Sequence, residues 1–319
     1  MDAKSESKKF LLSIIAPAFN EEAGVEEFRS RILKILEAEK YTFELIFVND
    51  GSRDGTAMLL AKMAYEDKRI KVINFSRNFG HQLAVSAGFD YAKGDAVVVI
   101  DADLQDPPEV IPQLVSKWHE GFEIVNAVRR SRKDGISKRL TAGLFYKFLN
   151  GMLTYKIPEN VGDFRLIDRK PLDILKSMRE QDRYIRGMTN WIGFKQAFVE
   201  FDRDKRFAGS THYPFRKMLT LAMNALFSFS SVPMKLAHWA FALFSLFSVL
   251  TVVYIVITKL TGSDVPGWTS QMLITVVFGA IQMFVLAIIS EYVGRIYQQG
   301  QERPLYIVAS ALNFPDNKS

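Results

Sequence analysis

The stretch Val97-Val-Val-Ile-Asp-Ala-Asp-Leu-Gln-Asp-Pro-Pro108 joins an apolar run to a cluster of acidic and amide side chains. The run Ala96–Ile100 has the length of a buried β-strand. Asp101 and Asp103 follow it two residues apart, so both would face one way on an extended chain. Carboxylates would repel a diphosphate, but together with Mg²⁺ or Mn²⁺ they can hold one. The stretch therefore predicts a strand that ends at a site for a divalent metal and a diphosphate.

Further apolar runs alternate with amphipathic stretches over residues 1–213. The runs are Leu11–Ala16, Phe43–Val48, Ile70–Phe75, Ala96–Ile100 and Ile124–Val128. The stretches between them are Glu22–Glu37, Thr56–Tyr65, Gln82–Tyr91 and Pro108–Trp118. This alternation predicts an α/β domain built from βαβ units around a mostly parallel sheet. Ligands of such sheets bind at the carboxyl ends of the strands.

Two more polar clusters stand where predicted strands end. Pro17-Ala-Phe-Asn-Glu-Glu22 follows the first strand, and Asn49-Asp-Gly-Ser-Arg-Asp-Gly55 follows the second. A single cluster of this kind is explained by turns and helix caps, for which Asn, Asp, Ser and Gly are preferred. Three acidic clusters at one edge of one sheet favour a binding site instead.

The last third of the chain contains two long segments without any charged residue. No Asp, Glu, Lys or Arg lies between Lys235 and Lys259, or between Asp264 and Glu291. Each gap exceeds the roughly 20 residues with which an α-helix crosses a bilayer. The gaps predict two transmembrane helices, at about 236–258 and 270–290, and two buried core helices are the alternative. The mean hydropathy of +0.02 thus averages two unlike parts.

Charge flanking these segments predicts their orientation. The loop between them is short and nearly neutral, whereas the outer flanks carry Arg216, Lys217, Lys235, Arg295 and Arg303. The positive-inside rule then places both termini and the α/β domain in the cytoplasm, as in an integral protein of the cytoplasmic membrane.

These predictions divide the chain into four parts. Residues 1–213 form the α/β domain, 214–233 an amphipathic helix at the membrane surface, 234–294 the two spans, and 295–319 a cytoplasmic tail. An ordinary helix packed on the α/β domain is the alternative for 214–233. Leu305–Val308 is apolar and could add a strand to a neighbouring subunit's sheet, which leaves a homo-oligomer open.

Composition narrows the chemistry and the partners. The absence of Cys excludes disulfides, thiolate nucleophiles and Cys-ligated zinc, and four His residues argue against a His-rich metal site. Lys+Arg 41 against Asp+Glu 35 gives a net charge of +6. That excess suits an anionic membrane surface or a phosphorylated substrate, and nucleic acid is not needed to explain it.

The three clusters, Pro17–Glu22, Asn49–Gly55 and Asp101–Glu109, resemble those of the inverting family 2 glycosyltransferases, which have the GT-A fold. Later motifs resemble the polyprenyl-phosphate subgroup, which includes dolichyl-phosphate mannose synthases and bacterial undecaprenyl-phosphate glucosyltransferases. These motifs are Val128–Gly135, Gly162–Asp168, Arg183–Gly187, Arg206–Gly209 and Glu291–Val308. The resemblance covers nearly the whole chain, and its two-span arrangement is most similar to that of the bacterial enzymes.

The resemblance implies a role for each matching residue. The nucleotide would be lined by Pro17, Phe19 and Glu21, its base edge read by Val48 and Asp50, and the donor contacted by Arg206 and His212. The metal and diphosphate would be held by Asp101, Asp103 and Gln105, and the acceptor phosphate by Arg129 and Arg139. Asp163 would be the catalytic or sugar-orienting carboxylate.

Three of these roles have alternatives. Asp163 could instead form a structural ion pair with Arg165 or Arg169, and the basic run at 129–133 could be a solvated surface. His212 stands where relatives often carry a Lys, and it could be a bystander. Because a lipid phosphate is already largely ionised at pH 7, Asp163 is expected to position more than to deprotonate.

The implied activity is transfer of a hexose from a nucleotide sugar to a polyprenyl phosphate. UDP-glucose with undecaprenyl phosphate is the first expectation, and GDP-mannose with dolichyl phosphate the second. A processive polysaccharide synthase should carry Gln-x-x-Arg-Trp, where this chain has Gln181-Asp-Arg-Tyr184. A nucleotidyltransferase should open with a Gly-rich phosphate loop, which is absent. A non-catalytic membrane scaffold would have no reason to keep Asp101, Asp103 and Asp163 together.

Overall fold

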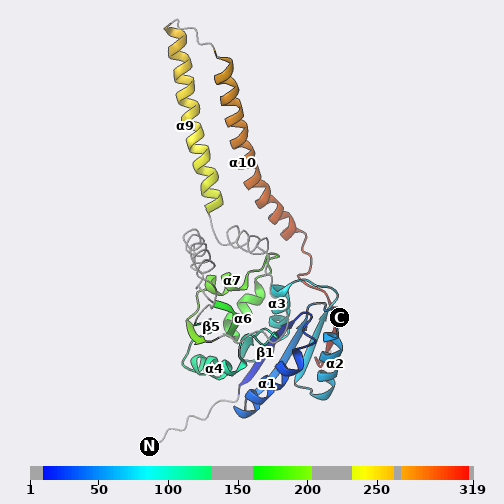
Figure 1. Ribbon diagram of the computed structural model, residues 1–319. Helices are drawn as coiled ribbons and strands as arrows, with labels where there is room; N and C mark the ends of the chain where they lie inside the picture. Colours follow the sequence, from blue (N-terminus) through cyan, green and yellow to red (C-terminus); the bar gives the residue numbers. More distant parts are fainter. Residues whose placement is uncertain (1–9, 131–160, 203–231, 262–266, 316–319) are drawn as a thin grey trace, which may run out of the picture. The chain divides into compact units, whose positions relative to one another are not determined.

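The computed structural model describes residues 10–130, 161–202, 232–261 and 267–315 (Figure 1). The chain divides into two compact units. One is an α/β domain, to which the C-terminal segment also belongs, and the other contains two long helices.

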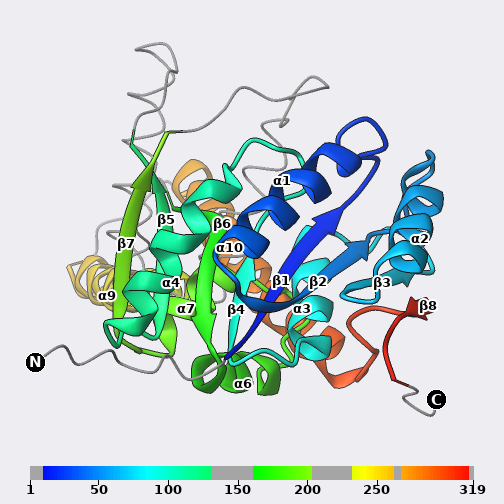
Figure 2. The same ribbon diagram turned by 90° about the horizontal axis from the view of Figure 1, so that it is seen from below.

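One mixed sheet forms the centre of the α/β domain. Its strands are β1 (Leu11–Ala18), β2 (Thr42–Asn49), β3 (Ile70–Phe75), β4 (Ala96–Val99), β5 (Ile124–Arg129), β6 (Val161–Asp168), β7 (Gln196–Phe201) and β8 (Val308–Leu312). They lie in the order β7-β5-β6-β4-β1-β2-β3-β8 (Figure 2). β1 to β4 are parallel, whereas β6 and β8 run antiparallel to their neighbours. All five predicted apolar runs form strands, and the carboxyl ends of β1, β2 and β4 meet at one edge.

Helices cover both faces of this sheet. They are α1 (Val25–Ala38), α2 (Thr56–Glu66), α3 (His81–Tyr91), the short η1 (Pro108–Val110), α4 (Ile111–His119), α6 (Arg169–Ser177) and α7 (Ile185–Trp191). Leu12, Ile14 and Ala16 of β1 belong to the core shared with α1, α2 and α4. On the other face, Gly88 of α3 lies so close to Ile15 that a Cβ would meet its side chain at 2.3 Å. Burial on both faces explains why these strands are continuous apolar runs.

The segment after the long helices returns to the α/β domain. β8 pairs antiparallel with β3, and the Tyr306 hydroxyl donates to Asp90 Oδ2 at 2.7 Å. The Tyr306 ring also stacks on Phe75, with centroids 5.1 Å apart. β8 thus covers the outer edge of β3 in its own chain. The cytoplasmic side of residues 295–319 and the homo-oligomer stay predictions.

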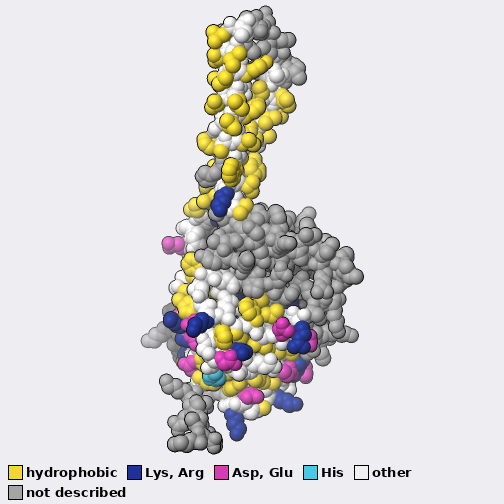
Figure 3. Space-filling model, turned by 90° about the vertical axis from the view of Figure 1, so that its left-hand side faces the viewer, with side chains coloured by type: hydrophobic (Ala, Val, Ile, Leu, Met, Phe, Trp, Pro, Cys, Tyr) yellow, Lys and Arg dark blue, Asp and Glu magenta, His cyan; other side chains and the backbone are white. Residues whose placement is uncertain are grey.

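The second unit consists of α9 (Val232–Leu260) and α10 (Trp268–Gly300). Val232–Tyr254 and Leu273–Gly300 are long and apolar enough to be candidate membrane spans, and none of either apolar window is buried. The described surface of these helices is mostly hydrophobic, whereas charged side chains gather on the α/β domain (Figure 3). Core helices of a soluble domain would bury such residues, so the exposure favours the predicted spans. The predicted amphipathic helix at 214–233 lies outside the described residues up to 231.

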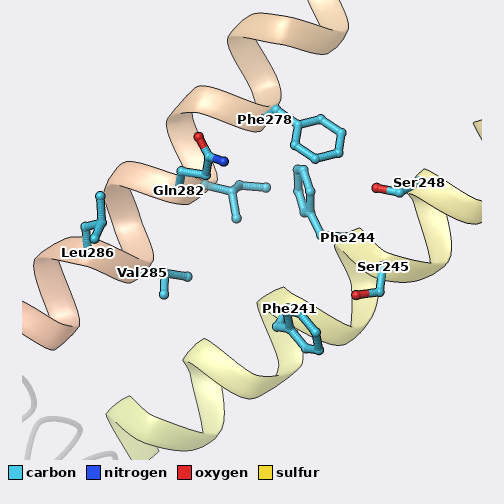
Figure 4. A pocket seen from close by; sticks show the side chains of 9 residues that line it. Phe241, Phe244, Ser245, Ser248, Phe278, Gln282, Val285 and Leu286 are labelled. Carbon is cyan, nitrogen blue, oxygen red and sulfur yellow. The ribbon is translucent and has the colours of Figure 1, made fainter.

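A groove of about 870 Å³ separates α9 from α10 (Figure 4). Phe244 and Phe278 meet edge to face within it, with ring centroids 4.7 Å apart. Gln282 also lines it, and none of the described residues that line it is charged. The three polar clusters predicted to form a site follow β1, β2 and β4 of the α/β domain.

Candidate active site

The loops that follow β1 and β2 are bonded to each other at the carboxyl edge of the sheet. Asn20 Oδ1 accepts from the Arg53 amide at 2.9 Å, and the Asn20 amide donates to Ser52 Oγ at 3.0 Å. Glu22 Oε2 accepts from the Gly55 amide at 2.9 Å. The prediction that the first two polar clusters share one edge is thus confirmed.

Asp50 joins this edge to the loop that leads into α3. Its carboxylate accepts from the amides of Phe79 at 2.7 Å and Gly80 at 3.0 Å, and from Asn78 Nδ2 at 2.9 Å. Burial raises the pKa of Asp50 despite these bonds. In this conformation Asp50 holds a loop, so its reading of a base edge stays a prediction. Val48 is fully buried in this conformation, and its reading of a base edge also stays a prediction.

Gly51 allows this close approach of loops, and its replacement gives a first testable prediction. Its φ is +69°, and a Cβ would meet the carbonyl carbon of Arg77 at 2.5 Å. Gly51→Ala is therefore expected to cost about 2–4 kcal/mol of stability, from backbone strain and overpacking together. The measurement is thermal unfolding of the detergent-solubilised full chain.

Gly121→Ala is the matched control for this prediction. Gly121 also has a positive φ, +93°, but a Cβ there meets nothing within 4 Å. The control carries backbone strain alone, so its melting temperature should fall clearly less. Equal losses in the two variants would show that the contact between the loops is not tight.

Asp101 and Asp103 lie on a turn, not on an extended strand. β4 ends at Val99, and Leu104 has a positive φ of 60° and a side chain buried in the core. The turn that buries Leu104 ends the two-residue periodicity, so the prediction that the two carboxylates share a strand face was wrong. Asp103 Oδ1 accepts from the Gln105 amide at 3.1 Å, and the Gln105 side chain is nearly buried.

Asp101 is the carboxylate whose surroundings most favour a cation. Its Oδ1 is enclosed and accepts no hydrogen bond. Burial, together with the nearby charges of Asp163, Asp106 and Asp103, raises the pKa of Asp101 to about 6. His81 Nε2, 3.6 Å away, is a cation near this oxygen, and a bound metal ion would further reduce the repulsion among the carboxylates.

The described residues offer only part of a metal coordination shell. Among them, no group of three or more His, Asp or Glu side chains is arranged to hold a metal ion by itself. Mg²⁺ is usually bound by one or two carboxylates together with water and substrate phosphates. Asp101 and Asp103, with Gln105 beside them, fit such a partial shell.

Asp163 on β6 is held by a cluster of donors. Arg186 of α7 donates twice, with Nε 2.9 Å from Oδ1 and Nη2 3.1 Å from Oδ2. His81 Nε2 and Gln82 Nε2, both from the first turn of α3, lie 3.2 and 3.3 Å from Oδ2. Although burial opposes ionisation, Arg186 and His81 keep the pKa of Asp163 well below its usual range. A carboxylate so held is suited to orienting a substrate more than to accepting a proton.

The ion pair considered between Asp163 and Arg165 is present, but Arg186 is the closer partner of Asp163. Arg165 Nη2 lies 4.0 Å from Asp163 Oδ1 and donates to the Gly162 carbonyl, while Arg165 Nη1 donates to Thr189 Oγ1. Arg169 bonds to Asp173 and to backbone carbonyls at the other end of the sheet. Of the two predicted partners, Arg165 is therefore a distant one, and the bonds of Arg169 lie elsewhere.

His81 links the two acidic parts of the site. Its Nε2 lies 3.2 Å from Asp163 Oδ2 and 3.6 Å from Asp101 Oδ1. Burial opposes protonation, but the charges of Asp101 and Asp163 raise the pKa of His81 to about 9. His81 therefore carries a positive charge at neutral pH and draws the end of β4 and the start of β6 together.

Sequence reasoning assigned no role to His81, Gln82 or Arg186. Asn78-Phe-Gly-His-Gln82 is a further polar cluster, between the third apolar run and its helix, and its place at the same edge was a usable signal. Arg186 belongs to the motif Arg183–Gly187, but nothing in the sequence around that motif indicates a contact with Asp163.

Arg129 reaches this site from the end of β5. Its Nη2 is 3.4 Å from Asp106 Oδ1 and 3.2 Å from where a Cβ on Gly162 would lie. Arg129 thus lies beside Gly162, the residue before Asp163. The other predicted acceptor-phosphate residue, Arg139, lies outside the described residues, as do Arg206 and His212.

The residues predicted to line the nucleotide differ in exposure. Phe19 is 43% exposed at the end of β1, so its ring face can receive a base. Pro17 is buried, and the Glu21 amide donates to Thr56 Oγ1 at 2.9 Å. Of these three side chains, Phe19 is the one best placed to contact a nucleotide.

Comparisons with known proteins show the family of this chain. The model of the glycosyl transferase family 2 matches residues 13–175. The chain is 45% identical to an uncharacterized glycosyltransferase, YkcC, of Bacillus subtilis (strain 168), over 98% of this chain and 97% of that one. It is 44% identical to an uncharacterized glycosyltransferase, sll0501, of Synechocystis sp., over 93% and 94% of the two chains. It is 38% identical to a prophage bactoprenol glucosyl transferase homolog of Escherichia coli (strain K12), over 93% and 98%.

Proposed function

The chain belongs to glycosyl transferase family 2, and on that premise we propose that it transfers a hexose from a nucleotide sugar to a polyprenyl phosphate. The observation that carries the proposal is the acidic site of Asp101, Asp103 and Asp163 with Arg129 beside it, in a chain that also has two candidate membrane spans. Relatives named for bactoprenol glucosyl transfer, similar over nearly their whole length, support a lipid phosphate as the acceptor.

The proposed reaction is a direct displacement at the anomeric carbon. A phosphate oxygen of the lipid attacks C1 of the sugar, the bond from C1 to the diphosphate oxygen breaks, and the nucleoside diphosphate leaves with the bonding electrons. A phosphate monoester has a second pKa near 6, so its attacking oxygen is already deprotonated at neutral pH. Inversion at C1 turns an α-linked donor into a β-linked lipid phosphate sugar.

Each described side chain has a defined part in this proposal. Asp101, Asp103 and Gln105 would hold the divalent ion, which when bound neutralises charge on the leaving diphosphate. Arg129 would orient the acceptor phosphate, because its guanidinium presents paired donors to such oxygens. Asp163, fixed by Arg186 and His81, would orient the sugar through its hydroxyls. Positioning and electrostatics would supply most of the rate.

We also propose a specific donor, a specific acceptor and the side of the membrane on which the reaction takes place. UDP-glucose and undecaprenyl phosphate are the first choice, since several relatives are named as bactoprenol glucosyl transferases. GDP-mannose with dolichyl phosphate is the second choice. The active site and both termini would face the cytoplasm, where the flanking Lys and Arg residues are expected.

A panel assay tests this proposal. The purified full chain is incubated with undecaprenyl phosphate or dolichyl phosphate and one radiolabelled nucleotide sugar at a time, with and without EDTA. We expect label in the organic extract with UDP-glucose, and its loss with EDTA. Label from GDP-mannose with dolichyl phosphate alone would favour the second choice. No lipid label from any donor would reject the proposal and favour a non-catalytic scaffold.

A further inference from the structure

Gln82, the second residue of α3, bonds at once to Asp163 and to the start of α7. Its Nε2 donates to Asp163 Oδ2 at 3.3 Å, and its Oε1 accepts from the Ile185 amide at 3.0 Å. Ile185 is the first residue of α7, and the residue before it, Tyr184, provides no side-chain cap. The amides of a helix's first turn have no acceptor within the helix, so Gln82 supplies one from another element.

This arrangement connects both members of the central ion pair. Arg186 follows Ile185 directly and makes two hydrogen bonds to Asp163. The Gln82 side chain therefore bonds both to the Asp163 carboxylate and to the backbone amide of Ile185, the residue next to Arg186. α7 has only seven residues, and an unpaired amide at its first residue would let its first turn loosen.

We propose that Gln82 is a positioning residue that fixes Asp163 and Arg186 relative to each other, so that Asp163 presents a fixed oxygen to the sugar. The inference rests on the proposed function, since it concerns the orientation of that substrate. Gln82 acts through Asp163 and does not itself contact the reacting atoms. A carboxylate displaced by a fraction of an ångström should slow the chemical step and leave donor binding almost unchanged.

Two variants of the full chain separate the two bonds of Gln82. Gln82→Met keeps the length of the side chain and removes both bonds. Gln82→Glu keeps an acceptor for the Ile185 amide, but it replaces the donor with a charge that repels Asp163. We expect kcat to fall about tenfold in both variants, at least as far in Gln82→Glu, with the donor KM within about twofold of wild type.

Gln196→Met is the matched control, because Gln196 of β7 supports the other end of α7. Its Nε2 donates to Asn190 Oδ1 at 3.0 Å and to the Thr189 carbonyl at 3.3 Å. Its kcat should stay within about twofold of wild type. Hydrogen exchange over residues 182–190 is a second readout, independent of activity: the first turn of α7 should exchange faster in Gln82→Met and not in Gln196→Met.

These readouts separate failure of the inference from failure of the proposed function. Wild-type kcat and exchange in Gln82→Met would overturn the inference, as would equal losses of kcat in Gln82→Met and Gln196→Met. Full activity in Gln82→Glu would show that only the Ile185 bond matters, which also contradicts it. If the wild type makes no glycolipid while exchange changes as expected, the proposed function fails and the positioning of Asp163 by Gln82 stands.

Discussion

Asp101→Asn is expected to lower kcat/KM for glycolipid formation by on the order of 10³-fold, or about 4 kcal/mol of transition-state stabilisation. The reason is that Asp101 Oδ1 is enclosed without a hydrogen bond, and that burial together with the neighbouring carboxylates raises the pKa of Asp101 to about 6. An amide in its place keeps the shape but removes the charge that would attract a divalent ion. Calorimetric titration with Mn²⁺ should show the same loss, independently of turnover.

Asp95→Asn is the control for this variant. Asp95 precedes β4, at the opposite end of the strand from Asp101, and its Oδ2 accepts from the Leu11 amide at 2.8 Å. An asparagine can accept that bond, so activity and Mn²⁺ affinity should remain within a few-fold of wild type. Retention of both by Asp101→Asn would contradict the metal and diphosphate role of the turn.

Asp163→Asn is expected to lower kcat by about 10²–10⁴-fold while the protein still binds Mn²⁺. The substitution removes the anion that Arg186, His81 and Gln82 hold in place, and with it the group proposed to orient the sugar. Kinetics at saturating donor, with Mn²⁺ titration alongside, measure the two effects separately.

Asp163→Asn also leaves Arg186 and His81 without their anionic partner. The effect of the substitution on stability must therefore be measured separately from its effect on catalysis. Removing one member of a buried pair costs about 3–5 kcal/mol, which could lower activity through unfolding alone. Arg186 is 27% exposed, which softens that cost. The double variant Asp163→Asn with Arg186→Met should recover melting temperature but not kcat. Recovery of kcat together with stability would show that Asp163 is structural.

Local patterns were sufficient to predict the first five strands and the edge at which the site lies. Apolar runs such as Val97–Ile100 were read correctly, because a strand buried on both faces leaves its mark in consecutive residues. The two-residue periodicity of a strand did not predict the conformation of the next residues, Asp101 and Asp103. Burial of Leu104 forces a turn there, and this depends on the core beneath α1 rather than on the neighbouring sequence.

The contacts of Asp163 could not be predicted for a related reason. Arg165 and Arg169 are close to it in sequence, yet Arg165 comes no nearer than 4.0 Å and Arg169 bonds to Asp173 and the Ala92 carbonyl. Arg186 lies 23 residues away and arrives because α7 begins beside α3. The partner of β8 was likewise set by the unpaired outer edge of β3, more than 230 residues earlier. Pairings of this kind depend on the assembled sheet.

The most direct test of the account is the mass and linkage of the lipid product made by the full chain from UDP-glucose and undecaprenyl phosphate. The proposed reaction predicts a lipid that has gained one hexose, with a β configuration at C1, and that keeps a single phosphorus atom. One free UDP should form for each lipid product. A product with two phosphorus atoms would show transfer of a sugar phosphate. Release of glucose to water without any lipid product would show that the lipid phosphate is not the acceptor. Either result would contradict the proposed reaction.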